Sequence, residues 1–105
     1  MRYNINMKIN HGSKRQAQQL LMEAIALLNN EEEASAFFND LCTPAELEAM
    51  ADRFQVVPLL RQGISYRSIH DQTGVSVTTI TRVARSLMMG SGGYSLIAER
   101  LNQHD

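Results

Sequence analysis

The stretch 65–87, SYRSIHDQTGVSVTTITRVARSL, constrains the fold of this chain more than any other. Ser65 is placed to cap a short helix that reaches about Thr73, and Gly74 then supplies the residue type that most readily takes a positive φ at a helix C-terminus. Ser76 caps a second helix. The apolar residues of both helices are predicted to face inward and to fix the angle between them: Ile69, Val75, Ile80, Val83 and Leu87. This pattern predicts a helix-turn-helix.

The rest of the chain also follows a 3.6-residue periodicity, with only two prolines and no Asn-Gly or Asp-Gly hairpin signal, so we predict an all-α protein. Thr43-Pro44-Ala45-Glu46 is a capping-box start, and Asn30 with Glu33 is a similar one. Pro58 falls inside a predicted helix and is expected to kink it or loosen one turn. Outside the helix-turn-helix, the expected helices span about 13–28, 31–41, 44–62 and 94–102.

The 105 residues suffice for one small domain. We expect residues 1–12 to be a flexible N-terminal tail and residues 13–105 to form a single helical domain. The first two helices have long apolar stripes, whereas the later helices are short and occupied with each other. Pairing between two subunits would bury those stripes, so the sequence predicts a homodimer.

The outward face of the second motif helix carries Thr and Arg, although threonine is a mediocre helix former. Threonine hydrogen-bonds to bases or phosphates, and arginine forks onto guanine or a phosphate. The first motif helix opens where side chains and backbone N–H groups typically meet phosphates. We therefore predict binding to double-stranded DNA through Tyr66, Arg67, Ser76, Val77, Thr78, Thr79, Thr81, Arg82 and Arg85.

Charge is distributed unevenly along the chain. Residues 61–90 hold four arginines and one aspartate, a net charge of +3, while the whole chain has −1, so the remainder carries −4. A basic segment on an acidic body suits groove binding with modest non-specific affinity. A solvated arginine face is the alternative interpretation of the same charges.

Other functions have less support in the sequence. The three histidines are scattered and Cys42 is the single cysteine, so neither a metal nor another cofactor is expected. No nucleophile–base or acid–base pair indicates an enzyme. No apolar run approaches the ~20 residues of a membrane span and no signal peptide is evident, so the expected location is the cytoplasm. The alternative function is a dimeric protein-interaction module without specific DNA binding, which would use the last helix or Phe37 and Phe38.

Two segments resemble the Trp repressor family: LCTPAELEAMADRFQVVPLLRQG at 41–63 and the helix-turn-helix at 65–87. A TP-E start, an arginine in the helix that follows and a T-I-T-R recognition helix occur in that family in the same order. The GIS-Y and GVS-TTITR patterns are similar to its YerC/YecD branch of bacterial regulators. The resemblance implies an intertwined all-helical dimer and a DNA-binding transcriptional regulator that acts as a repressor.

The resemblance also implies a small-molecule effector site. In the Trp repressor, tryptophan is held by a threonine at the third-helix cap, an arginine in that helix and the arginine of T-I-T-R. In that protein the last arginine is followed by a glycine, which lies beside the indole. Val83 stands at this position here, and its isopropyl group would crowd the flat indole ring. We therefore expect an effector other than tryptophan, at Thr43, Arg53, Arg82, Val83 and Ser86. For the two arginines, the alternative roles are phosphate contacts or ion pairs with Glu46, Glu48 or Asp52.

Overall fold

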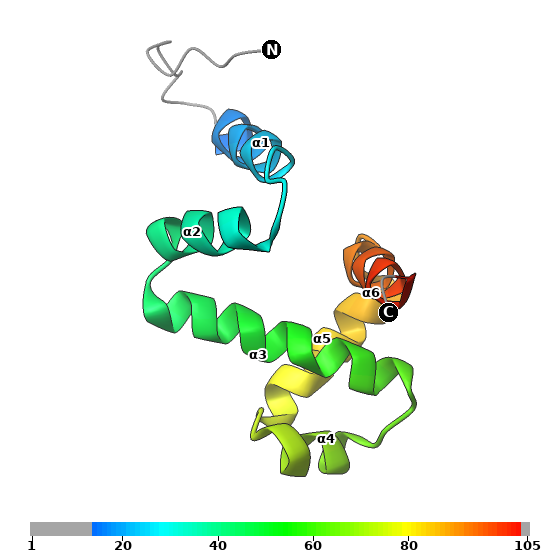
Figure 1. Ribbon diagram of the computed structural model, residues 1–105. Helices are drawn as coiled ribbons and strands as arrows, with labels where there is room; N and C mark the ends of the chain where they lie inside the picture. Colours follow the sequence, from blue (N-terminus) through cyan, green and yellow to red (C-terminus); the bar gives the residue numbers. More distant parts are fainter. Residues whose placement is uncertain (1–13, 104–105) are drawn as a thin grey trace. The chain divides into compact units, whose positions relative to one another are not determined.

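The computed structural model describes residues 14–103, which form six α-helices and no strand, as the sequence predicts (Figure 1). The helices are α1 (Lys14–Ile25), α2 (Glu31–Leu41), α3 (Pro44–Arg61), α4 (Tyr66–Thr73), α5 (Val77–Met89) and α6 (Gly93–Gln103). The chain divides after Leu41 into two compact units. The predicted tail over residues 1–12 lies outside the described residues. Within the described range, no helix is both long and apolar enough to span a bilayer.

The first unit contains α1 and α2. The predicted cap of α2 is confirmed, since the Asn30 side-chain oxygen accepts the Glu33 N–H at 2.9 Å. The Glu33 carboxylate in return accepts the N–H of Asn29, one residue before the cap, also at 2.9 Å. Helix α1 ends at Ile25, earlier than the predicted end near Leu28. The last two residues of this segment instead bond to carbonyls three residues back, which forms a tighter turn.

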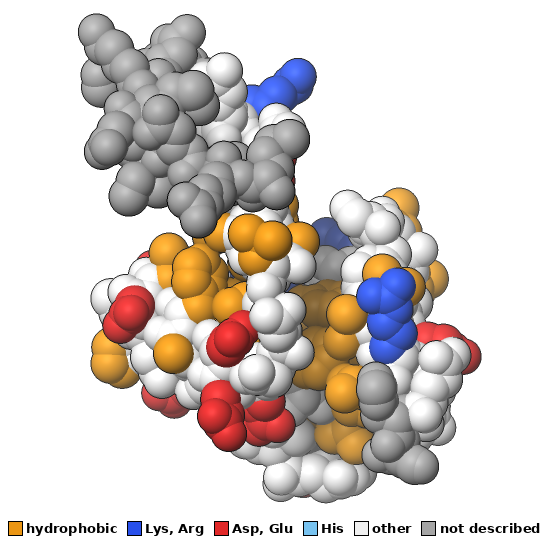
Figure 2. Space-filling model, turned by 45° about the horizontal axis from the view of Figure 1, so that its top comes forward, with side chains coloured by type: hydrophobic (Ala, Val, Ile, Leu, Met, Phe, Trp, Pro, Cys, Tyr) orange, Lys and Arg blue, Asp and Glu red, His pale blue; other side chains and the backbone are white. Residues whose placement is uncertain are grey.

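Neither helix of the first unit contains a fully buried residue. Leu20, Met22 and Leu27 are 39%, 59% and 63% exposed, and Figure 2 shows hydrophobic side chains open at the molecular surface. Helices of this length are marginally stable in water unless an amphipathic face packs against something. The apolar faces of α1 and α2 therefore need a further surface to cover them.

The second unit begins with α3, which starts at the predicted capping box. The Thr43 hydroxyl accepts the Glu46 N–H at 3.1 Å, and the Glu46 carboxylate accepts the Thr43 N–H at 2.8 Å. Pro58 does not divide this helix, which continues to Arg61. Because the proline lies in the last turn, the helix loses only the bond to the carbonyl of Phe54, and the next residues close the C-terminus normally.

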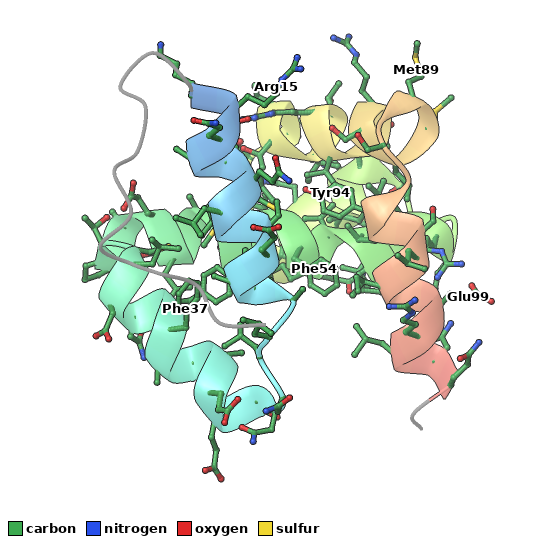
Figure 3. All side chains as sticks on the ribbon, turned by 90° about the horizontal axis from the view of Figure 1, so that it is seen from above. Arg15, Phe37, Phe54, Met89, Tyr94 and Glu99 are labelled. Carbon is green, nitrogen blue, oxygen red and sulfur yellow. The ribbon has the colours of Figure 1, made fainter. Side chains whose placement is uncertain are left out.

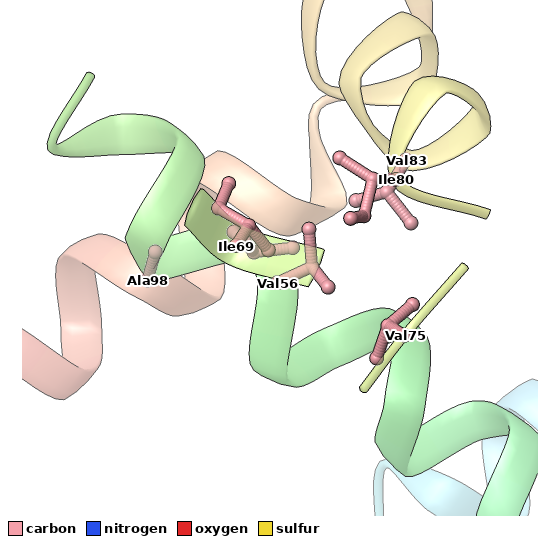
Figure 4. Packing of buried hydrophobic residues seen from close by; sticks show 7 residues of the cluster. Val56, Ile69, Val75, Ile80, Val83 and Ala98 are labelled. Carbon is pink, nitrogen blue, oxygen red and sulfur yellow. The ribbon is translucent and has the colours of Figure 1, made fainter. Parts of the chain in front are cut away.

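A small aliphatic core holds α3, α4 and α5 together (Figure 4). Val56, Val57, Ile69 and Ile80 are completely buried and Val83 is 1% exposed. The prediction of the inward-facing set is confirmed for four of its five members: Ile69, Val75, Ile80 and Val83. The fifth, Leu87, is half-buried and packs at the margin of the cluster.

Helix α6 packs against α3 and α5. The rings of Phe54 on α3 and Tyr94 on α6 lie 6.3 Å apart, and Figure 3 shows both between these helices. Arg61 and Glu99 form an ion pair of 2.8 Å at the far end of α3. The side chains of Arg61 and Glu99 are 32% and 61% exposed, so solvent screens the pair and it contributes at most about 1 kcal/mol. Ring packing and Ala98, which is buried, hold α6 in place.

Candidate nucleic-acid interface

The structure has the predicted helix-turn-helix, with α4 and α5 joined by a three-residue turn. Ser65 caps α4 by accepting the Ser68 N–H at 3.2 Å. Gly74 ends α4 with φ of 77°, the left-handed conformation that favours glycine. Ser76 caps α5 by accepting the Thr79 N–H at 3.1 Å. The two capping serines and the glycine that ends α4 therefore have the roles that the sequence predicts.

Helix α5 presents two different faces. Its inner face buries Ile80, Val83 and Ala84 in the core, which fixes the rotation of the helix about its axis. The residues on the other face are exposed, and within residues 14–103 their side chains make no hydrogen bond or ion pair: Thr78, Thr81, Arg82 and Arg85. Polar groups held outward in this way are available to an external ligand.

The other predicted DNA contacts on α5 differ in availability. The hydroxyl of Ser76 donates to the hydroxyl of Thr79 at 3.0 Å, so both groups take part in the cap. Thr79 is also half-buried. Val77, in contrast, is 48% exposed at the first turn of the helix. Among the predicted DNA contacts on α5, the free hydroxyls thus belong to Thr78 and Thr81.

The start of α4 supplies a second polar surface. Tyr66 is 41% exposed and Arg67 is exposed. In the part of the chain that the structure describes, the backbone N–H groups of these two residues bond to no acceptor. Unpaired N–H groups at a helix start carry partial positive charge and favour phosphate. The arginine side chain adds a full positive charge to the same end.

The candidate effector residues have separate surroundings. The Thr43 side chain is engaged in the α3 cap, while Arg53 is half-buried in the same helix. Arg82 and Ser86 are exposed on α5, which packs against α3. Val83 belongs to the core. Within the described residues, no ion pair joins either arginine to the three acidic residues considered above.

Two hollows on the surface are lined by other residues. One, of about 340 Å³, lies between the end of α3 and α6 and is lined by Phe54, Pro58, Arg61, Gln62, Ala98, Leu101 and Asn102. The other, of about 870 Å³, is an open depression over α2. Over residues 14–103, no three His, Cys, Asp or Glu side chains gather in a way that would hold a metal ion.

One side chain of the motif has a role that the sequence reasoning missed. The sequence suggests only that the three histidines are scattered, but Nδ1 of His70 lies 2.8 Å from the carbonyl oxygen of Val75 in the turn. The sequence signal for this contact is a histidine five residues before the carbonyl it meets, with a glycine turn between them. The contact depends on the left-handed conformation of Gly74, which folds the chain back toward α4.

Comparison with known proteins gives consistent matches. Residues 16–102 match the family model described as Trp repressor protein. The uncharacterized protein YerC of Bacillus subtilis (strain 168) is 39% identical over 83 residues, which cover 79% of this chain and 80% of YerC.

Two crystal structures are also similar. One is a "putative Trp repressor" from Staphylococcus aureus, 40% identical, with a TM-score of 0.79 over 85% of this chain and 89% of that chain. The other is a TrpR like protein from Eubacterium eligens ATCC 27750, 42% identical, with a TM-score of 0.79 over 89% and 96% of the two chains.

The α3 cap leads to a prediction on pH. The hydrogen bonds from the backbone and then the side chain of Thr43 lower the pKa of Glu46 from its ordinary 4.5. A lowered pKa in the folded state means that the carboxylate stabilises the fold above about pH 4.5, and that this contribution disappears as the pH falls through the lower, folded-state pKa. Thermal unfolding of Glu46→Gln should therefore show a deficit relative to the wild type near pH 7 that shrinks as the pH falls from 4.5 toward about 3.

Glu48→Gln is the matched control for this measurement. Glu48 is exposed on the same helix and makes no hydrogen bond or ion pair within the described range. Its variant should unfold with the wild type at both pH values. A deficit of Glu46→Gln that is the same at both pH values would contradict the role of the ionised carboxylate in the cap.

Proposed function

The chain belongs to the Trp repressor family, in the branch that includes YerC, and we propose that it is a dimeric, sequence-specific DNA-binding regulator of transcription. Repression is the expected outcome of its binding. The observation that carries this proposal is the division of α5 into a buried aliphatic face and an open face of threonine and arginine. A helix held in this way presents a rigid polar surface to the major groove.

The proposed contacts divide by their chemistry. The N-terminal part of α5, with Val77 and Thr78, enters the groove and meets base edges. Arg82 and Arg85 lie one and two turns further along and contact guanine or phosphate. The start of α4, with Arg67 and the free N–H groups, binds the adjacent phosphate. Phosphate contacts set the position and base contacts set the sequence preference.

A second copy of the chain is the proposed partner of its exposed apolar surfaces. Leu96, Ile97 and Leu101 on α6 are 50%, 43% and 51% exposed, and α1 and α2 bury nothing fully. A two-fold dimer that covers these faces would also place two copies of α5 against two half-sites about one turn of DNA, ~34 Å, apart. Dimerisation would thus complete both the core and the DNA-binding surface.

A small-molecule effector other than tryptophan is proposed to modulate this arrangement. The exposed guanidinium of Arg82 and the half-buried one of Arg53 lie on two helices that pack together, and they suit an anionic group. Such an effector would act by binding one spacing of the two α5 helices better than another. Val83 is a core side chain here, so the space that glycine leaves beside the indole in the Trp repressor is filled.

The alternative is a protein-interaction module that does not bind specific DNA. The observation in its favour is the aromatic pair on α2, where Phe37 and Phe38 pack edge to face at 5.5 Å and are both half-buried. Either this pair or the exposed apolar side chains of α6 would suit an apolar partner. The DNA-binding experiment below separates the two functions.

Replacing both outer arginines of α5 should weaken DNA binding. For Arg82→Ala combined with Arg85→Ala, the affinity for a selected DNA fragment should fall at least about tenfold. The slope of log K against log salt should shrink by about one for each phosphate-contacting arginine removed. Fluorescence anisotropy over a salt series measures both.

Arg100→Ala is the matched control, since Arg100 is exposed on α6, away from the helix-turn-helix sequence. It should bind as the wild type does. If the wild type selects no fragment from genomic DNA, or if the double variant keeps the wild-type salt slope, the proposed interface is wrong.

Tryptophan should not bind in the micromolar range. The reason is steric, because the isopropyl group of Val83 occupies core space at the position where the Trp repressor has glycine. Isothermal titration calorimetry with L-tryptophan should give no saturable heat. A micromolar Kd would show that the effector site resembles that of the Trp repressor after all.

A further inference from the structure

The turn between α4 and α5 is held by side chains of α4. Val75 lies outside both helices, so helical hydrogen bonds satisfy neither of its backbone polar groups. Its N–H donates to the hydroxyl oxygen of Thr73 at 3.1 Å, and its carbonyl lies 2.8 Å from Nδ1 of His70. The Thr73 hydroxyl in turn donates to the carbonyl of Ile69 at 2.7 Å. Both backbone groups of this residue are thus bonded to the last turn of α4.

The side chain of Val75 is held as well. It is 5% exposed and belongs to the core cluster with Ile69 and Ile80. The residue that connects the two helices is therefore fixed at its side chain, its N–H and its carbonyl. Because α5 begins two residues later at Val77, any rotation at this position would tilt the whole recognition helix.

The chemistry of the contact assigns a tautomer to His70. A carbonyl oxygen only accepts hydrogen bonds, so the imidazole must carry a proton on Nδ1 and donate it to Val75. In the neutral ring the other nitrogen, Nε2, is then unprotonated. His70 is exposed, so solvent does not require this tautomer, and the bond to the turn provides the reason for it.

We propose that His70 is the positioning residue of the recognition helix: its Nδ1–H fixes the turn and thereby the angle of α5 relative to α4. The effect of this contact on DNA binding rests on the proposed function. Base contacts require side chains held within a fraction of an ångström, and the phosphate-binding start of α4 and the base-reading start of α5 must keep one relative geometry. Thr73 on the same helix accepts the N–H of Val75, and within residues 14–103 the carbonyl of Val75 has its side-chain donor in His70.

The first test is independent of DNA. Long-range proton–nitrogen NMR of the wild-type protein distinguishes the two tautomers of the neutral imidazole ring. The expected result is an Nδ1-protonated His70. A predominantly Nε2-protonated ring would overturn the proposal.

The second test uses substitutions that move or remove the donor. His70→Asn keeps an N–H donor at the δ position of the side chain, while His70→Gln shifts it to the ε position and His70→Leu removes it. The His70→Asn protein should bind a selected DNA site with an affinity within about twofold of the wild type. The affinity of the His70→Gln and His70→Leu proteins should fall about fivefold or more. Amide hydrogen exchange over residues 75–79 should accelerate in the His70→Gln and His70→Leu variants and stay unchanged in His70→Asn.

Gln72→Ala is the matched control, because the Gln72 side chain donates to Ser68 at 3.1 Å within α4 and, in the described range, forms no hydrogen bond to the turn. It should keep the wild-type DNA affinity and exchange rates. If His70→Asn binds DNA as weakly as His70→Leu, or if all three His70 variants bind as the wild type does, the positioning role is wrong. Absence of DNA binding by the wild type would reject the proposed function, while the tautomer and exchange data would still decide whether His70 fixes the turn.

Discussion

The second unit depends on the aliphatic contact between α3, α4 and α5. Val56 and Val57 on α3, Ile69 on α4 and Ile80 on α5 are completely buried against one another. Each fully buried side chain of this size stabilises the fold by about 2 kcal/mol. The cluster also sets the rotation of α5, so the same residues that stabilise the fold decide which side chains face outward.

The proposed interface follows from that rotation. Because Ile80 and Val83 are buried in the core, the opposite face of α5 is exposed to solvent. This face carries Thr78, Arg82 and Arg85. Hydrogen bonds at the ends of the helices then refine the arrangement, through the serine caps and the contact between His70 and Val75. Function in this protein would thus come from the polar residues that a tightly packed small core leaves outside.

Local signals in the sequence were sufficient for much of the fold. Ser65, Gly74 and Ser76 each act through the backbone within four residues, and each was predicted correctly. The end of α1 was predicted too late, because the apolar periodicity continues to Leu28 although the backbone turns more tightly at Leu27 and Leu28. Pro58 was expected to kink α3 or loosen one turn, and it lies in the last turn, where the missing N–H removes one helical bond while the helix continues to Arg61.

Contacts between different helices could not be predicted from the sequence. The ion pair of Arg61 with Glu99 joins residues 38 positions apart, and no pattern along the chain brings them together. The outer residues of α5 could be named as a set, but their division into free and cap-bound hydroxyls depends on the geometry around Ser76 and Thr79. Periodicity assigns a residue to a face, whereas hydrogen-bond distances decide whether its polar group is available.

Selection from a random double-stranded DNA library is the most direct test of a dimer that reads sequence through α5. After several rounds, the recovered sequences should share a two-fold symmetric motif whose half-site centres are about 10 base pairs apart. Such a motif would support both the DNA-binding role and the symmetric pairing of two chains. Recovery of sequences with no shared motif would contradict the account.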